Sequence, residues 1–172
     1  MNNPGIFQPT GGTFEITGNN ENGFVYFNTG NYFHNFVVNR GPIAFSYFAT
    51  NDPVTIQNNF TIENGMFRSG SVAISVQGNA AINSDGVLAL DGVGSLLMGD
   101  SRSLTINNGG LLELNGTITE QPKISRISSG KYAFNVESGG TIGAVYALFE
   151  HMNTNGINIK SGAIVDLSLI HI

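Results

Sequence analysis

Residues 104–109 read Leu-Thr-Ile-Asn-Asn-Gly, a short pattern that recurs along the chain and decides its fold. The first three residues alternate between apolar and polar, as in a strand that buries one face. Asn and Gly follow, and both tolerate the positive φ angles of tight turns. The stretch therefore predicts a short strand that ends in a turn.

Five further copies of this pattern occur, and they begin at Phe14, Phe36, Phe60, Phe134 and Ile157. Copies that follow each other directly are 22, 24 or 23 residues apart, and such a period is typical of repeat architectures. The interval of 44 residues between Phe60 and Leu104 equals two periods of 22. We therefore expect a degraded copy near residues 82–86 (INSDG).

One interval is longer than the others. Leu104 and Phe134 begin copies that are 30 residues apart, which places an insertion of several residues near 119–130. This stretch contains Pro122 and is locally the most charged. We expect it to leave the repeat as a loop.

The period has a direct structural meaning. Parallel strands stack about 4.8 Å apart, so a strand that recurs once per coil would place aromatic on aromatic and β-branched on β-branched residues. Aligned Asn side chains at the turns can form amide ladders. The residues expected to line the interior are Phe14, Ile16, Phe36, Val38, Phe60, Ile62, Leu104, Ile106, Phe134, Val136, Ile157 and Ile159. Shorter echoes of the alternation fit the other sides of a three-stranded coil, at residues 54–56, 74–76, 88–90 and 112–114.

We therefore predict an all-β chain, a right-handed parallel β-helix of about seven coils of 22–24 residues, with a single domain over residues 1–166. A β-sandwich of the immunoglobulin or jelly-roll type is the alternative, because it also has short strands and Gly-rich turns. A sandwich, however, has no reason to repeat one pattern at constant spacing. A leucine-rich repeat has a similar period, but the chain lacks the LxxLxLxxN line of that family.

Composition supports a β-rich chain and excludes several classes of function. Only 11% of the 172 residues are charged whereas Gly reaches 23, which suits turns and strands better than helices. The net charge is −5 and the seven Lys and Arg residues are scattered singly, so we expect no nucleic-acid partner. No apolar run approaches the roughly 18 residues that span a bilayer, and residues 1–5 lack the features of a signal peptide. The absence of Cys excludes disulfides and thiolate metal sites.

Two stretches resemble a known family. Residues 104–116 (LTINNGGLLELNG) resemble coils of large secreted, cell-surface β-helix proteins of Bacteroidota-type bacteria, in the pectin-lyase-like superfamily. Residues 136–166 are similar to further coils of the same proteins. The resemblance implies an extracellular or outer-surface location, with the export signal and sorting domain elsewhere in the parent protein. It does not imply an activity, because the superfamily contains polysaccharide lyases and hydrolases as well as adhesins and passive stalks.

The last six residues have a separate resemblance. Residues 167–172 (LSLIHI) are similar to the translation of a transposase sequencing adapter that remains at the ends of assembled metagenomic reads. We interpret them as a non-native tail, and the alternative is one more strand. Because no polar terminal cap is evident, we expect an excerpt whose neighbour is the remainder of a longer solenoid chain.

Three aspartates form the densest group of acids, Asp85, Asp91 and Asp100, and Arg102 follows them. A calcium-dependent lyase of this fold needs several carboxylates on one strand face and a basic residue to abstract a proton. The contexts SDG, LDG and GDS are instead typical of turns, where Asp is favoured for its local hydrogen bonding. The DD and NTD motifs of paired acids that an inverting polygalacturonase would use do not occur. We therefore interpret the three as turn residues.

Glu150 and His151 are the only acid and histidine that are neighbours in the chain. Adjacent strand residues point to opposite faces, so the two side chains would not meet unless a bend intervenes. We expect His151 to be an outward or corner residue, and we interpret His34 in the same way. The sequence thus predicts no catalytic, cofactor-binding or metal-ligating residue, and no cofactor.

The N-terminal part is rich in rings: Phe24, Tyr26, Phe27, Tyr32, Phe33, Phe36, Phe45, Tyr47 and Phe48. Exposed rings on a solenoid wall could bind sugar faces, whereas alternating rings could also stack inward near one end. We favour the inward stacks, because aromatic side chains mostly serve burial.

The leading functional hypothesis is a non-enzymatic structural or adhesive segment of a large secreted or cell-surface bacterial protein, with polysaccharide or a cell surface as its partner. The alternative is a carbohydrate-active β-helix enzyme, a lyase or hydrolase, whose catalytic coils lie outside this chain. A carbohydrate-binding segment is the third hypothesis.

Overall fold

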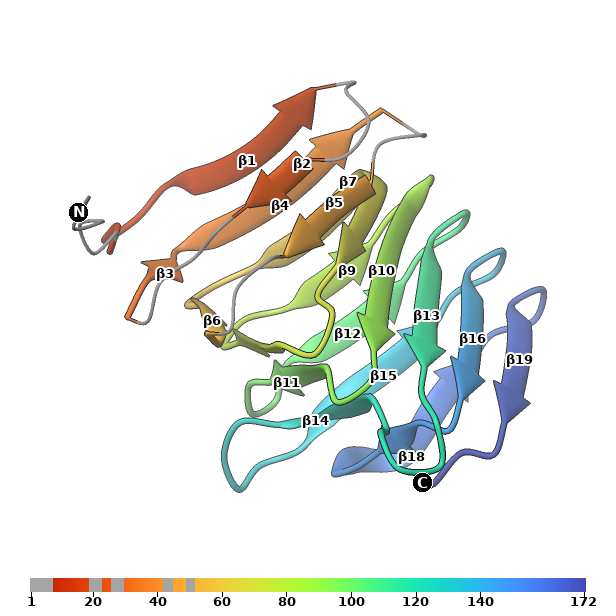
Figure 1. Ribbon diagram of the computed structural model, residues 1–172. Coiled ribbons are helices and arrows are strands. Elements are labelled where there is room, and N and C mark those ends of the chain that lie inside the picture. Colours follow the sequence, from red (N-terminus) through yellow and green to blue (C-terminus); the bar gives the residue numbers. More distant parts are fainter. Residues whose placement is uncertain (1–7, 19–22, 26–29, 42–44, 49–51) are drawn as a thin grey trace.

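The computed structural model describes residues 8–18, 23–25, 30–41, 45–48 and 52–172, with the backbone alone for 23–25 and 45–48. Every regular element in these residues is a β-strand, and every strand pairing is parallel. The strands form three walls that run along the molecule (Figure 1). We call them walls A, B and C.

The bounds of the strands are as follows. Wall A contains β1 (Thr13–Gly18), β4 (Asn35–Arg40), the first half of β7 (Phe60–Arg68), β9 (Ala80–Ile82), β12 (Ser103–Ile106), β15 (Tyr132–Val136) and β18 (Met152–Ile159). Wall B contains β2 (Gly23–Val25), β5 (Phe45–Phe48), the second half of β7, β10 (Gly86–Asp91), β13 (Leu111–Asn115), β16 (Thr141–Val145) and β19 (Ile164–Ser168). Wall C contains β3 (Tyr32–Phe33), β6 (Val54–Ile56), β8 (Ala73–Val76), β11 (Ser95–Met98), β14 (Lys123–Arg126) and β17 (Leu148–Phe149).

The chain visits walls A, B and C in turn and then returns to wall A, one strand further along the axis. This confirms the predicted parallel β-helix with three strands per coil. The solenoid makes about six turns, where about seven were predicted, because β18 and β19 only begin another turn. In Figure 1 the coils stack from β1 at one end to β19 at the other.

The strand register follows the repeated pattern. Phe14 pairs with Phe36 and Phe36 with Phe60, so the predicted copies lie directly above one another. The degraded copy begins at Ala80, which pairs with Phe60 on one side and Leu104 on the other. The interval of 44 residues is therefore divided into 20 and 24, and not into two equal periods.

The extra residues of the long coil are divided between two corners. The register partners Leu88 and Leu112 on wall B, Leu96 and Ile124 on wall C, and Leu104 and Phe134 on wall A are 24, 28 and 30 residues apart. Four extra residues therefore lie between β13 and β14, and two more lie between β14 and β15. The strand β14 falls inside the stretch 119–130 that was expected to be a loop, and it remains part of wall C.

The core is one continuous column between the walls. On wall A, Phe14, Phe36 and Phe60 stack with ring centroids 5.6 and 5.7 Å apart. The next residue in this column is the small Ala80, and Phe67 from wall B packs edge-on to Phe60 with 5.4 Å between ring centroids. Each such ring pair adds about 0.5–1.5 kcal/mol to the stability that burial provides.

Among the described residues, three Asn–Asn pairs join the outer surfaces of neighbouring coils; two of them lie at or beside corners, where the sequence predicted amide ladders, and the third lies on the strands β15 and β18. The Nδ2 groups of Asn58, Asn107 and Asn158 donate to the Oδ1 atoms of Asn35, Asn83 and Asn135, over 2.9, 2.7 and 3.0 Å. These bonds connect residues 23 or 24 positions apart. The polar surface therefore reinforces the same register that the core specifies.

Candidate functional site

The three predicted turn aspartates lie at three different corners of one coil. Asp85 follows β9 at the A–B corner, Asp91 ends β10 at the B–C corner, and Asp100 follows β11 at the C–A corner. The backbone of Asp85 has a φ of 62°, a left-handed conformation that Asp tolerates better than most residues. Because the three carboxylates sit at separate corners of the coil, they do not converge on a common ligand. Across the described ranges, no group of three or more His, Cys, Asp or Glu side chains is arranged to hold a metal ion.

Asp100 ties two coils together. Its carboxylate accepts a hydrogen bond from the Ser128 hydroxyl at 2.7 Å and another from the Gly130 backbone N–H at 3.0 Å. A Cβ atom at Gly130 would overlap this carboxylate, which explains why glycine occupies the position. Arg102, which the sequence places close to Asp100, lies exposed at the same corner.

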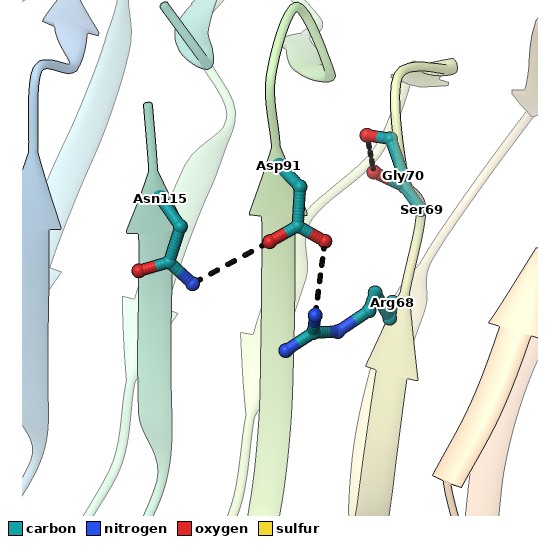
Figure 2. Close-up of polar contacts among 5 residues, drawn as sticks. All are labelled: Arg68, Ser69, Gly70, Asp91 and Asn115. Carbon is teal, nitrogen blue, oxygen red and sulfur yellow. Dashed lines mark hydrogen bonds and ion pairs between the residues drawn. The ribbon is translucent and has the colours of Figure 1, made fainter. Parts of the chain in front are cut away.

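Figure 2 shows a polar row that crosses three coils on the outer face of wall B. Arg68 of β7 places Nη1 3.3 Å from Oδ2 of Asp91 in β10, and Asn115 of β13 donates from Nδ2 to Oδ1 at 3.4 Å. The Arg68 and Asp91 side chains are 30% and 29% exposed, so water screens the ion pair and its contribution is about 0.2–1 kcal/mol. Both carboxylate oxygens of Asp91 are therefore engaged by neighbouring coils.

A second polar cluster lies on wall C. The Ser125 hydroxyl, which is almost fully buried, donates to Oε2 of Glu150 at 3.1 Å, and Nζ of Lys123 lies 3.8 Å from the same oxygen. Nucleophilic catalysis by serine requires a base that removes the proton and donors that stabilise the resulting oxyanion. The cluster supplies the Glu150 carboxylate and the Lys123 ammonium group. The same hydrogen bond and ion pair also serve to link β14 to the next coil, at the residue after β17.

Tyr132 lies inside the solenoid next to this cluster. Its side chain is fully buried, and its hydroxyl donates to the backbone carbonyl of Ile124 at 3.3 Å. Burial raises the pKa of the Tyr132 phenol well above its usual range, and the negative charge of Glu150 raises it further. The phenol is therefore neutral at physiological pH.

An open cavity of about 540 Å³ lies beside the corner between β17 and β18. Its lining includes Glu150, His151, Asn153 and His171. His151 has a φ of 62°, so a bend separates it from Glu150, and both residues border the same cavity. Alternation along a strand predicts that these two side chains do not meet unless a bend intervenes, and the structure contains that bend. His34 lies elsewhere, between β3 and β4 at the opposite end of the solenoid.

Sequence reasoning missed two parts of this region. The contact between Ser125 and Glu150 joins residues 25 positions apart, and that offset depends on how the insertion is divided between two corners. His171 comes from the stretch 167–172, where a backbone bridge pairs it with Leu148. No motif in the sequence signals either contact.

Of the N-terminal rings, Phe33 and Phe36 are buried in the core, and Tyr32 is half-buried. Phe36 contacts Phe33 with ring centroids 5.0 Å apart, which is the inward stacking that the sequence favours. The side chains of Phe24, Tyr26, Phe27, Phe45, Tyr47 and Phe48 lie outside the described residues.

The fold defines the class of this protein as a parallel β-solenoid. Comparisons with models of protein families, with curated proteins and with solved structures found no match. The resemblance to pectin-lyase-like surface proteins therefore stays a prediction. Over the described ranges, no helix is long and apolar enough to cross a membrane.

Proposed function

We propose that this chain is a non-enzymatic structural segment of a larger bacterial surface protein, in which the solenoid serves as a stalk or an adhesive wall. The proposal rests on one observation: three acidic side chains form their hydrogen bonds and ion pairs with neighbouring coils. Asp91, Asp100 and Glu150 each accept hydrogen bonds or ion pairs from a neighbouring coil. Acids that bind the next coil stabilise the stack, whereas catalytic acids need their oxygens directed at a substrate.

The Asn–Asn pairs between coils support the same function. Asn pairs join one coil to the next at three places along the solenoid, and each inner coil is stabilised by both of its neighbours. Such a wall is suited to spanning distance and to presenting a repetitive surface. An extracellular or outer-surface location belongs to this proposal, and it rests on the resemblance of residues 104–116 and 136–166 to coils of surface proteins.

The test is exposure of the purified chain to a panel of uronic-acid polysaccharides, with calcium present and absent. New reducing ends and unsaturated products are measured for cleavage, and co-sedimentation is measured for binding. We expect binding without cleavage, or neither. Cleavage of any polysaccharide by the chain would refute a non-enzymatic role.

A second candidate function, carbohydrate binding or turnover at the cavity beside β17 and β18, is favoured by one observation. Glu150 and two imidazoles, those of His151 and His171, border the same open cavity. If cleavage were found, Glu150→Gln should abolish it, and Glu120→Gln should not. Glu120 is a suitable matched control because it is an exposed acid in the loop between β13 and β14.

A further inference from the structure

The fold gathers basic residues that lie apart in the sequence. Of the seven Lys and Arg residues, Arg40 is buried, and Arg68 and Lys123 form ion pairs with acids of neighbouring coils. In Figure 1 one corner between walls C and A joins β11 to β12 and β14 to β15. Three of the other four basic residues lie at this corner, and we call them the cationic corner: Arg102, Arg126 and Lys131.

Hydrogen bonds hold the cationic corner together across two neighbouring coils. Ser101, the residue before Arg102, donates its backbone N–H to the carbonyl of Lys131 at 2.8 Å. The side chain of Arg126 extends to the same place, because its Nη1 donates to the carbonyl of Gly130, the residue before Lys131, at 3.2 Å. Neighbouring coils are about 4.8 Å apart, so the three cations lie within one small area of the surface.

Acids do not neutralise this positive charge. Among the described residues, no carboxylate lies within ion-pair distance of Arg102, Arg126 or Lys131. Asp100 belongs to the same corner, but its two carboxylate oxygens accept hydrogen bonds from the loop 127–130. Arg102 and Lys131 are exposed, and Arg126 is half-buried. The corner therefore keeps an excess of positive charge in a chain whose net charge is −5.

The corner is also fixed in shape and retains unused donors. The Asp100 carboxylate and the Arg126 guanidinium both bond to the loop 127–130, so little of its backbone needs to be ordered when a ligand binds. Arg126 uses Nη1 for its bonds to this loop. Its Nη2 and Nε groups remain to donate to an oxyanion in the forked geometry that guanidinium groups favour.

We propose that the cationic corner binds a sulfated polysaccharide through its sulfate groups. This inference rests on the adhesive role proposed above, because it names the chemistry of the partner that the wall would hold. The exposed position of the three cations favours a polymer over a single anion. One exposed ion pair contributes little, whereas a chain of linked anionic groups can contact several cations at once and gains from multivalency.

Two observations favour a sulfated polysaccharide over other anionic polymers. Proteins that bind single-stranded nucleic acid add aromatic rings on which bases stack, but Tyr132, the only aromatic residue between positions 99 and 133, is fully buried. A sulfate ester has three acceptor oxygens and a carboxylate has two. A sulfate group can therefore accept hydrogen bonds from Arg126 and from a second cation of the corner at the same time.

The test uses three polymers that share one neutral backbone: dextran sulfate, carboxymethyl dextran and unmodified dextran. Isothermal titration calorimetry measures the binding of each polymer to the full chain at several salt concentrations. We expect dextran sulfate to bind with an affinity that falls as salt rises, because salt screens exposed charges. Carboxymethyl dextran should bind more weakly, and unmodified dextran should not bind.

Single substitutions locate the binding site on the surface. Arg102→Gln and Lys131→Gln should each weaken binding to dextran sulfate roughly fivefold, the effect of one Lys or Arg beside an anionic surface. Lys131→Arg should retain the wild-type affinity. The matched control is Lys160→Gln, which removes one exposed positive charge at the end of β18, away from the corner, and should change the affinity less than twofold. Arg126 is left unchanged, because its substitution would also release the loop 127–130.

Circular dichroism verifies that each variant keeps its β-structure, and a DNA duplex is titrated as a competing polyanion. The proposal would be overturned if dextran sulfate did not bind, if carboxymethyl dextran or the duplex bound as tightly, or if Lys160→Gln weakened binding as much as Lys131→Gln. Failure to bind leaves the non-enzymatic role intact, because only cleavage of a polysaccharide refutes that role.

Discussion

Truncation of Phe60 tests whether the stacked ring column stabilises the solenoid as the structure indicates. Phe60 is buried in the middle of wall A, and its ring contacts Phe36 and Phe67 with centroids 5.7 and 5.4 Å away. Replacing a buried Phe by Ala costs about 3–5 kcal/mol. The next residue in the column is already Ala80, so Phe60→Ala would place two alanines in succession and leave a cavity in the column. We therefore expect Phe60→Ala to lose about 4 kcal/mol of unfolding free energy, near the middle of that range.

The assay is urea-induced unfolding followed by circular dichroism, with stability calculated from the transition midpoint and slope. Phe60→Leu should cost no more than about 1.5 kcal/mol, because it keeps most of the buried volume. The matched control is Thr61→Ala, the neighbouring residue on the outer face of wall A, which should change stability by about 0.5 kcal/mol or less. A loss below about 1.5 kcal/mol for Phe60→Ala, or an equal loss for Thr61→Ala, would refute the assignment of inward and outward faces.

Three further predictions concern other parts of the solenoid. Gly110→Ala should destabilise the chain by about 2 kcal/mol, because a Cβ there would lie 2.5 Å from the backbone oxygen of Ile82. The matched control is Gly143→Ala, where a Cβ meets open space, so this variant should be neutral or slightly stabilising. Thermal unfolding of the two variants measures the difference in stability. Tyr132→Phe should cost about 1 kcal/mol at neutral pH through loss of one hydrogen bond. Because the pKa of Tyr132 is raised in the folded state, the stability that its neutral form contributes is complete below a pH of about 10 and is lost as the pH rises above that value. Tyr132→Phe has no phenol to ionise, so its free energy of unfolding should fall less steeply than that of the wild type in an alkaline titration. A chain that ends at Asp166, without residues 167–172, should retain the β-sheet circular dichroism of the full chain, because β1 to β18 do not include these residues. Loss of that signal would show that the fold requires the last six residues.

The repeat is legible in the sequence because each coil repeats the same local requirements. A strand that stacks on its own copies needs similar residues at similar positions, so Phe14, Phe36 and Phe60 identify both the strand and its register. The existence of a degraded copy between Phe60 and Leu104 was also predicted from the spacing, near residues 82–86, whereas its start at Ala80, which divides the interval unequally, was not. Such details depend on how many residues each corner contains.

The contacts between coils were harder to predict, because they depend on those corner lengths. Ser125 meets Glu150 only because the insertion is divided into four and two residues around β14, and nothing in composition fixes that division. The shared position of Glu150 and His151 beside one cavity depends on a left-handed φ at His151, a conformation that few non-Gly residues adopt, although His adopts it more often than most, and that local sequence does not specify. Local pattern therefore predicts the walls, and three-dimensional packing determines the corners.

The fold depends on a parallel register that continues across the insertion, and disulfide trapping can test this register because the chain has no native Cys. Thr105 and Asn135 are register partners on wall A although they are 30 residues apart in the chain. Adjacent strands bring Cα atoms to about 4.8 Å, within the range that a disulfide bridges. Thr105→Cys with Asn135→Cys should therefore cross-link efficiently under mild oxidation, while Thr105→Cys with Glu137→Cys, two residues out of register, should not. Efficient cross-linking of the second pair and failure of the first would contradict the register and the solenoid built on it.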